Sequence, residues 1–266
     1  MAGALSMEAV MTENRRDLFD YNSVFEADDY LYFYENSVSF DQTRKEVDFL
    51  LKEMSITREM NILDLACGHG RHSNILAGHG CSVTGIDINP EFLELAKKQA
   101  AELKVEVDYR LLDMRQVSFR DKFDKAIILF TSFGYFDDAE NLGVLSNVNQ
   151  ALKPGGMLCF DLPNRDRFLK YYSPFLVNEK GNDLMIDRNS YDYATGRWHN
   201  KRIVIRNGIR KDKPFSVRLY TYPEIKEFLN KSGFEIFKVF GDWDGELYGH
   251  DSKRMIVIAK KPLVSD

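Results

Sequence analysis

The sequence predicts an α/β fold in which a mostly parallel sheet is interrupted once by an antiparallel insertion. Between residues 61 and 162, short apolar runs alternate with helical segments, which is typical of βαβ units. The alternation stops at Pro163. Residues 183–220 then have the pattern of antiparallel strands joined by turns, and Asn207-Gly208 is a strong hairpin signal. Because the alternation resumes at residue 222, we expect the insertion to cap the α/β domain rather than form a separate module.

The elements of the α/β part are predicted from apolar spacing and from residues that start or stop a helix. Val47, Leu50 and Met54 recur at helical spacing, so residues 41–54 are expected to form an amphipathic helix. Pro90 opens another helix, which reaches about residue 103, since proline fits the first helical turn. Further helices are predicted over 71–77, 137–152 and 222–231, and strands over 61–66, 82–88, 105–112, 123–130, 157–162, 234–240 and 255–259.

This pattern divides the chain into three kinds of segment. Residues 1–40 begin with a polar stretch that is expected to fray and continue with a dense aromatic stretch. Residues 41–164 and 221–266 carry the α/β alternation. Residues 165–220 form the insertion, of which 165–175 are aromatic and basic and are expected to be helical or irregular. The length of 266 residues suits one large domain with small additions.

The composition excludes several classes of protein. A formal net charge of −5 does not favour nucleic-acid binding. No run approaches the roughly 20 apolar residues of a membrane span, and no charged leader precedes an apolar core at the N-terminus. The three cysteines, Cys67, Cys81 and Cys159, are expected to be free thiols. Together these features predict a cytoplasmic protein without a membrane or nucleic-acid partner.

Residues 62–72 carry the clearest chemical signal, since an apolar strand ends there in a glycine turn that opens a helix. Gly68 and Gly70 let the backbone approach a ligand closely, and the helix N-terminus offers free amides. They match two glycines of the dinucleotide fingerprint GxGxxG, but Ser73 stands at the third position, which disfavours a nicotinamide or flavin. Asp64, inside the strand, suits a ligand that carries a positive charge.

This run resembles motif I of class I S-adenosylmethionine (SAM)-dependent methyltransferases, which is an acid followed by x-G-x-G-x. Ala66 stands at a common glycine position of the motif, and Cys67 stands at a variable one. The form Ala-Cys-Gly-x-Gly-Arg-His is frequent in small-molecule methyltransferases of this class. The resemblance covers about residues 40–163 and 221–261. It implies a Rossmann-like, doubly wound seven-stranded sheet whose last strand, over 254–260, is antiparallel to its neighbour.

The resemblance also implies which residues bind SAM. Asp87 would hold the ribose hydroxyls, as an acid does in dinucleotide folds. Asp113 would bind the adenine amino group, and Met114 would pack against the ring. Phe130 would lie at the methionine end, and Arg71 near the carboxylate of the cofactor. The implied cofactor set is Asp64, Ala66, Cys67, Gly68, Gly70, Arg71, Asp87, Ile88, Asp113, Met114 and Phe130.

The aromatic residues within 19–40 would form a lid, as in related small-molecule methyltransferases, although simple core packing would also explain them. Tyr30 and Tyr34 share one helical face and are therefore expected at the cofactor. Phe33 lies beside them and is expected at the substrate. Trp243 belongs to the loop before the last strand, which approaches the substrate mouth in related proteins.

The methyl group of SAM is already electrophilic, so the protein mainly has to orient an acceptor and exclude water. Where the acceptor must lose a proton, a general base helps, and the candidates are Asp161, His199 and Tyr135. A metal site is not expected. The histidines and cysteines of residues 67–81 straddle a turn, a helix and a strand, so their side chains diverge.

The predicted function is transfer of a methyl group from SAM to a nitrogen or oxygen of a small molecule, with some similarity to amino-sugar N-methyltransferases. Three alternatives stay open. A tRNA or protein methyltransferase would show a basic groove beside Gly68. A dinucleotide-dependent oxidoreductase would bind NAD in place of SAM. A SAM-binding protein without catalysis would share the cofactor site. The acceptor, the general base and any homo-oligomer are left open.

Overall fold

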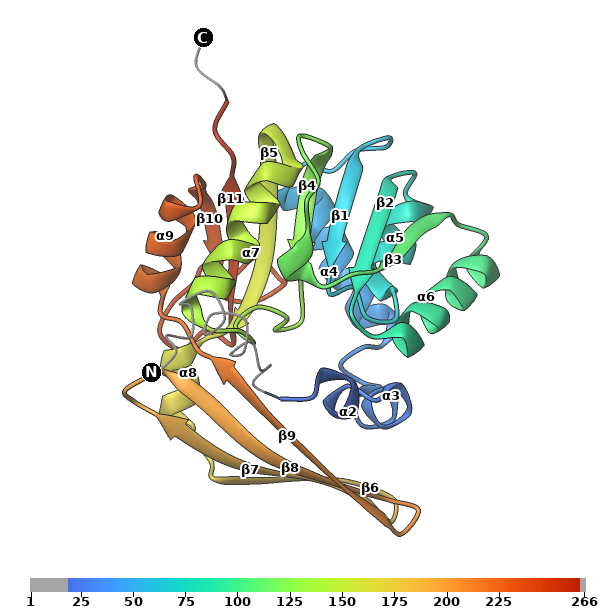
Figure 1. Ribbon diagram of the computed structural model, residues 1–266, viewed down its shortest axis with the longest axis vertical. Helices are drawn as coiled ribbons and strands as arrows, with labels where there is room; N and C mark the ends of the chain where they lie inside the picture. The colour runs from blue at the N-terminus through green and yellow to red at the C-terminus, as the bar shows by residue number, and fades with distance from the viewer. Residues whose placement is uncertain (1–18, 264–266) are drawn as a thin grey trace, which may run out of the picture.

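The computed structural model describes residues 19–263 and contains two sheets (Figure 1). The larger sheet has seven strands in the order β10-β11-β5-β4-β1-β2-β3, and the smaller sheet has four in the order β6-β7-β8-β9. In the larger sheet, β11 pairs antiparallel with both β5 and β10, and the other pairs are parallel. The predicted α/β fold, with its antiparallel last strand and inserted antiparallel strands, is therefore confirmed.

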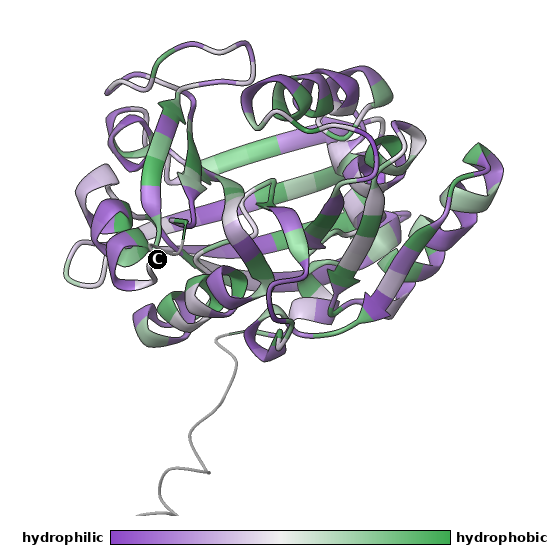
Figure 2. Ribbon diagram, turned by 90° about the horizontal axis from the view of Figure 1, so that it is seen from above, coloured by the Kyte–Doolittle hydropathy of each residue, from purple (hydrophilic) through white to green (hydrophobic). Residues whose placement is uncertain are grey.

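Helices cover both faces of the larger sheet, and the central strand shows how each face is filled. Ile62 packs on one face with Val47 of the first long helix, whereas Leu63 packs on the other with Leu145 and Ile225. In Figure 2 the flanking helices carry both hydrophobic and hydrophilic stretches, as expected of amphipathic helices. Among the described residues, no helix is long and apolar enough to cross a membrane.

The bounds of these elements agree closely with the predicted ranges. The strands are β1 (Asn61–Leu65), β2 (Ser82–Asp87), β3 (Val107–Leu111), β4 (Phe123–Ile128), β5 (Leu152–Pro163), β10 (Glu235–Phe240) and β11 (Arg254–Lys260). The helices are α4 (Phe40–Glu53), α5 (Arg71–Gly78), α6 (Pro90–Leu103), α7 (Asp138–Ala151) and α9 (Tyr222–Lys231). Since β1 lies between β2 and β4, the strand order reverses there. Such a switch point opens a crevice at the carboxyl ends of the strands.

The insertion forms the smaller sheet, which we call the cap. It contains α8 (Arg165–Lys170), β6 (Phe175–Lys180), β7 (Asp183–Asp192), β8 (Arg197–Arg206) and β9 (Ile209–Arg218). Asn207 and Gly208 connect β8 to β9 with positive φ angles of 53° and 75°, which is the geometry that their hairpin signal predicted.

The strand β6 was not predicted, because the antiparallel pattern was expected to begin at residue 183. This strand forms the outer edge of the cap, and five of its six residues are exposed. Its contacts with the lid are few, through Asn178 and Lys180, and its sequence shows no regular alternation of apolar and polar residues. The sequence pattern therefore offered nothing that would mark a half-buried strand.

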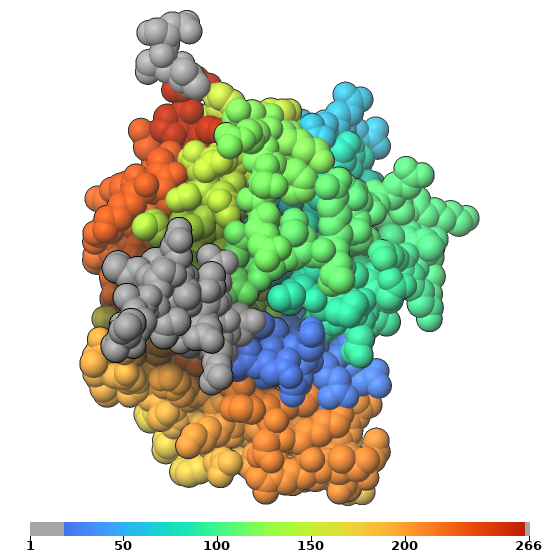
Figure 3. Space-filling view, viewed as in Figure 1, coloured from blue at the N-terminus to red at the C-terminus, as the bar shows by residue number. Residues whose placement is uncertain are grey.

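Two short helices, α2 (Tyr21–Val24) and α3 (Ala27–Tyr34), lie between the cap and the α/β domain (Figures 1 and 3). We call residues 19–38 the lid. Ion pairs fasten it to β9: Lys211 and Lys213 each contact both Glu26 and Asp29. Residues 1–18, which the sequence assigned to the same N-terminal segment, lie outside the described residues.

Candidate active site

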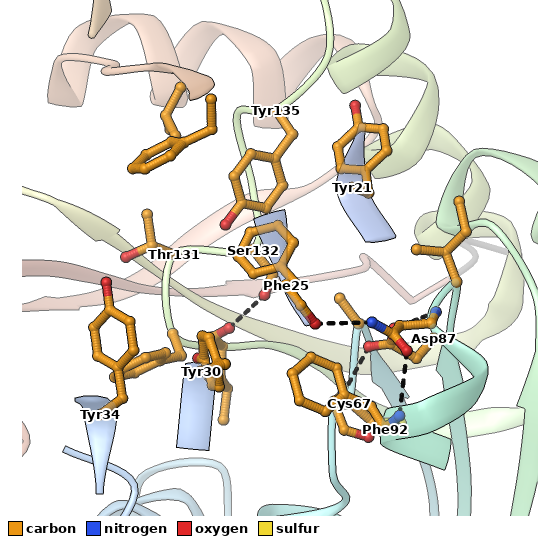
Figure 4. A pocket seen from close by; sticks show the side chains of 18 of the residues that line it. Tyr21, Phe25, Tyr30, Tyr34, Cys67, Asp87, Phe92, Thr131, Ser132 and Tyr135 are labelled. Carbon is orange, nitrogen blue, oxygen red and sulfur yellow. Dashed lines mark hydrogen bonds between the residues drawn. The ribbon is translucent and has the colours of Figure 1, made fainter. Parts of the chain in front are cut away.

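A cavity of about 500 Å³ lies at the carboxyl ends of the central strands, between the α/β domain, the lid and the cap (Figure 4). Most of the residues expected at the cofactor line it, together with one expected base. These residues are Tyr30, Tyr34, Asp64, Ala66, Cys67, Gly68, Arg71, Asp87, Ile88, Asp113, Met114, Phe130 and Tyr135. The cavity therefore occupies the crevice that the strand order predicts.

The turn after β1 owes its shape to backbone angles that are unusual outside glycine. Ala66 and Gly68 have φ angles of 53° and 55°, and the N–H of Cys67 donates to the carbonyl of Ile86 on β2. A left-handed conformation costs an alanine roughly 1–2 kcal/mol. The value at Ala66 explains why this motif position commonly holds glycine.

Gly70 has a different role from Gly68, although both were expected at the cofactor. Gly70 does not line the cavity, and a Cβ atom there would lie 2.1 Å from the hydroxyl of Tyr109. At Gly68 a Cβ atom would meet nothing within 4 Å and would enter open space at the cavity. The first glycine thus leaves room for a ligand, whereas the second leaves room for the protein's own packing.

Replacing each of these glycines by alanine should therefore have opposite consequences. We expect Gly70→Ala to destabilise the protein by about 3 kcal/mol, because it adds a collision to a positive φ angle. Gly68→Ala should cost only about 1 kcal/mol of stability but should weaken cofactor binding. Urea unfolding and calorimetric titration with SAM measure the two effects, and equal losses of stability in the two variants would contradict this assignment.

Asp87 is fixed where a ligand with paired hydroxyl groups would meet it. Its carboxylate accepts hydrogen bonds from the N–H groups of Gly68 and Asn89, both at 2.8 Å. Burial raises the pKa of this carboxyl group. A carboxylate has about four acceptor sites, so two remain for a ligand.

Asn89 also lines the cavity, although its sequence position marked it only as the residue before a helix. Its side-chain oxygen caps α6, and its side-chain nitrogen donates to the carbonyl of Phe25 in the lid at 2.9 Å. The lid is thereby tied to the site that holds Asp87.

Asp113 lies at the far end of the cavity, directly before a short 3₁₀ helix, η1 (Met114–Gln116). Its carboxylate accepts from the guanidinium of Arg115 at 2.6 Å, so its charge is neutralised locally. The backbone N–H and the guanidinium of Arg115 together make four hydrogen bonds to this carboxylate, so a ligand amino group would have to compete with them.

Ser73 stands at the third glycine position of the dinucleotide fingerprint, and its hydrogen-bonding partner is Asp64. The hydroxyl of Ser73 donates to the Asp64 carboxylate at 2.6 Å, and both residues are buried. Burial raises the pKa of Asp64 to about 7. A cationic ligand in the cavity would favour the ionised form of this carboxyl group.

A buried charge cluster supports the start of α5. The carboxylate of Glu46 on α4 accepts from Nη1 of Arg71 at 2.5 Å and lies 2.7 Å from Nε2 of His72. Burial alone would raise the pKa of Glu46, but the hydrogen bond and charge of His72, with the charge of Arg71, lower it to about 2. Burial lowers the pKa of His72 to about 4, so its ring is neutral at pH 7.

Arg71 has an unused donor beside the cavity. Its Nη2 atom is buried and makes no hydrogen bond within the described part of the chain. A buried guanidinium nitrogen without a partner is costly, and a carboxylate in the cavity would satisfy it. This arrangement suits the amino-acid end of SAM.

The segment directly after β4 forms one wall of the cavity. Phe130 and Thr131 have φ angles of 58° and 65°, and the guanidinium of Arg71 lies 5.2 Å from the Phe130 ring. The N–H of Phe130 donates to Asp161, while Arg254 bonds to both Asp161 and Thr131. These contacts hold two strained residues in place.

Two of the three expected bases are not at the cavity, and these expectations are corrected. Asp161 is 1% exposed, pairs with Arg254 and does not line the cavity, so it positions the Phe130 segment. His199 is exposed on β8, on the opposite face from Trp198, because side chains alternate along a strand. Tyr135 does line the cavity, but burial raises its pKa well above the usual range. It therefore stays protonated at neutral pH, so it can donate a hydrogen bond but is not available as an ionised base.

Two residues expected at the substrate also lie elsewhere. Trp243 is buried, with its ring 5.2 Å from that of Phe49. Phe33 packs with Met185 and Val204 of the cap, so it fastens the lid rather than lining the cavity. Tyr30 and Tyr34, from the same helix, do line it, with ring centroids 4.8 Å apart.

The cap supplies lining residues that the sequence pattern did not single out. Arg202 is buried and pairs with Asp187. Trp198 and Phe215, from β8 and β9, lie beside it, with ring centroids 5.2 Å apart. The alternation of side chains along each strand predicts that these residues share one face of the cap. It does not predict which face packs against the α/β domain.

Metal binding is not suggested by the geometry. Among residues 19–263, no group of three histidine, cysteine or acidic side chains is arranged to hold an ion. His69 lines the cavity, and burial lowers its pKa to about 4.

Comparison with known proteins shows what the chain is similar to. Residues 62–156, which contain the glycine turn, Asp87 and Asp113, match a family model described as a methyltransferase domain. A putative methyltransferase of Bacillus subtilis, YqeM, is 27% identical over 216 residues, which cover 79% of this chain and 87% of the relative.

Solved structures share the fold at lower identity. A SAM-dependent methyltransferase from Clostridium acetobutylicum superposes with a TM-score of 0.77 at 18% identity, covering 89% of this chain and 98% of the other. The sugar N-methyltransferase KedS8 from a Streptoalloteichus species gives a TM-score of 0.66 at 17% identity and covers 98% of both chains. Residues 62–156 thus form a methyltransferase domain, and the chain has the fold of class I SAM-dependent methyltransferases.

Proposed function

We propose that the enzyme methylates a nitrogen or oxygen atom of a small molecule that is enclosed between the lid and the cap, and releases S-adenosylhomocysteine. One observation carries this proposal. The cavity that contains Asp87 and Gly68 also includes Trp198 and Phe215 of the cap, so cofactor and acceptor would share one cavity.

The residues present fit SAM, whose bound form supplies an electrophilic methyl group. Asp87 would accept from the ribose hydroxyls. Asp64 and Arg71 carry opposite charges next to the glycine turn, which suits the amino and carboxylate groups of an amino acid. Phe130 and Tyr34, with ring centroids 6.2 Å apart, would bound the reacting end.

Positioning, rather than proton removal by the protein, would supply most of the acceleration. Asp187 is paired with Arg202, Asp161 is paired with Arg254, and Tyr135 stays protonated. An acceptor that reacts as a free amine or an ionised oxygen would need only orientation and exclusion of water. Its proton would pass to solvent.

The alternatives that the sequence left open receive less support. Beside Gly68 the cavity is lined by the carboxylates of Asp64 and Asp87 as well as by Arg71, and this mixed charge differs from the basic surface expected for tRNA. Ser73, which donates to Asp64, stands at the position of the third glycine in the dinucleotide fingerprint, and this disfavours a dinucleotide. The sugar N-methyltransferase among the structural relatives is consistent with a small acceptor.

We also propose that the enzyme acts in the cytoplasm, because its three cysteines are free thiols and buried.

A metabolite screen tests the proposal. The purified enzyme is incubated with SAM and pools of small amines, alcohols and phenols, and release of S-adenosylhomocysteine is recorded. We expect at least one pool to give release that requires both acceptor and enzyme. Release only with tRNA or protein substrates would contradict a small acceptor, and tight binding of SAM without release in any pool would favour a binding protein.

A further inference from the structure

We propose that the acceptor is a planar aromatic molecule with few polar substituents, and not a polyhydroxylated sugar. This inference rests on the proposed function and concerns the half of the cavity that the cap and lid enclose. Its basis is the aromatic surface found there and the pairing of the polar side chains of the cap with one another.

Aromatic rings dominate the walls of this half. From the cap, the Trp198 ring lies 5.3 Å from Phe168 and 5.2 Å from Phe215, measured between ring centroids. The lid contributes Phe25, and the segment after β4 contributes Tyr135; their ring centroids lie 5.6 Å apart, and both residues line the same cavity (Figure 4). Rings in such edge and tilted arrangements offer flat faces to a planar guest.

The polar groups of the cap are already satisfied by one another. Both oxygens of Asp187 accept from Arg202, at 2.7 and 3.1 Å. The indole N–H of Trp198 donates to Oδ1 of Asn189 at 2.9 Å, and the Asn189 amide donates to the carbonyl of Ser173 at 3.0 Å. These side chains have little remaining capacity to replace the water that a sugar hydroxyl would lose.

The consequence for recognition is a penalty that grows with the number of hydroxyl groups. Each hydroxyl that is buried without a partner weakens binding by about tenfold or more. The Tyr135 hydroxyl makes no hydrogen bond within residues 19–263, stays protonated, and faces the cavity. It would serve one polar atom on the acceptor, so the surface of the cap favours a ring with few polar substituents over a sugar.

Calorimetric titration of the wild-type enzyme tests this inference with three probes in the presence of S-adenosylhomocysteine. The probes are 2-naphthol, which is planar and aromatic, 2-decalol, which has the same carbon count but is saturated and puckered, and glucosamine. We expect 2-naphthol to bind at least tenfold more tightly than either of the others. Equal binding of 2-decalol, or tighter binding of glucosamine, would overturn the inference.

Variants locate the binding and separate it from folding. Trp198→Leu should weaken 2-naphthol binding by about three- to tenfold, whereas Trp198→Phe should retain most of it. Both variants lose the bond to Asn189, so their difference reports the aromatic ring alone. His199→Ala, on the exposed face of the same strand, is the matched control and should leave binding unchanged. Equal loss in both Trp198 variants would contradict an aromatic wall.

The same titrations distinguish this inference from the function on which it rests. S-adenosylhomocysteine is titrated first, and failure of that step contradicts the proposed function. The three probes are then also titrated without it, so that their order of affinity tests the acceptor class in either case.

Discussion

Asp87→Asn is expected to lower the affinity for SAM by about 100-fold or more. Asp87 would accept hydrogen bonds from two ribose hydroxyls, and hydrogen bonds to a charged group are each worth about 1.5–3 kcal/mol. The substitution also turns an amide N–H toward the backbone N–H of either Gly68 or Asn89, which disturbs the turn itself. Calorimetric titration of SAM into the variant measures the loss.

Asp108→Asn supplies a matched control for this experiment. Asp108 belongs to the neighbouring strand β3, is about half exposed, and pairs with Arg110 on the surface. We expect its substitution to leave SAM affinity unchanged. An unchanged affinity in Asp87→Asn, with the variant folded as judged by circular dichroism, would remove Asp87 from the cofactor site.

Glu46→Gln is expected to destabilise the fold by about 3–5 kcal/mol at pH 7, because it leaves the Arg71 guanidinium buried without its carboxylate. Asp48→Asn is the control on the same helix. Asp48 is exposed, and we expect its substitution to change stability by less than about 0.5 kcal/mol. Urea unfolding at pH 7 measures both effects, and a loss below about 1 kcal/mol in Glu46→Gln would contradict the structural role of this cluster.

The effect of Glu46 should also depend on pH with a definite sign. Its pKa falls from an ordinary value of 4.5 to about 2 in the folded protein. A carboxyl group with a lowered pKa stabilises the fold above its unfolded pKa, and the benefit disappears as the pH falls through its folded pKa. The stability difference between wild type and Glu46→Gln should therefore be constant above about pH 5 and shrink between pH 4.5 and 2.

Much of the cofactor half could be predicted because its determinants are close together in the sequence. A strand, a glycine turn and a helix follow one another within residues 61–78. The local structure of this segment therefore fixes how Asp64, Gly68 and Arg71 lie relative to one another. Glu46 could not be found in this way. It lies on the preceding helix and meets Arg71 and His72 only through packing.

The acceptor half was harder to predict, for a reason that lies in strand geometry. Adjacent residues of a strand point to opposite faces of the sheet. Whether Trp198 or His199 faces the cavity therefore depends on which face of the cap meets the α/β domain. The sequence shows this alternation but not which face of the cap meets the domain. Trp243 failed as a prediction for a related reason, because its loop folds back on the core beside Phe49.

The central claim is that this cavity binds SAM, and competitive titration tests it most directly. Wild-type protein is titrated by calorimetry with SAM and, separately, with NAD. We predict binding of one SAM per chain and NAD affinity at least 100-fold weaker, because Ser73 takes the place of the third glycine and bonds to Asp64. Absence of SAM binding, or NAD binding as tight as that of SAM, would contradict the account.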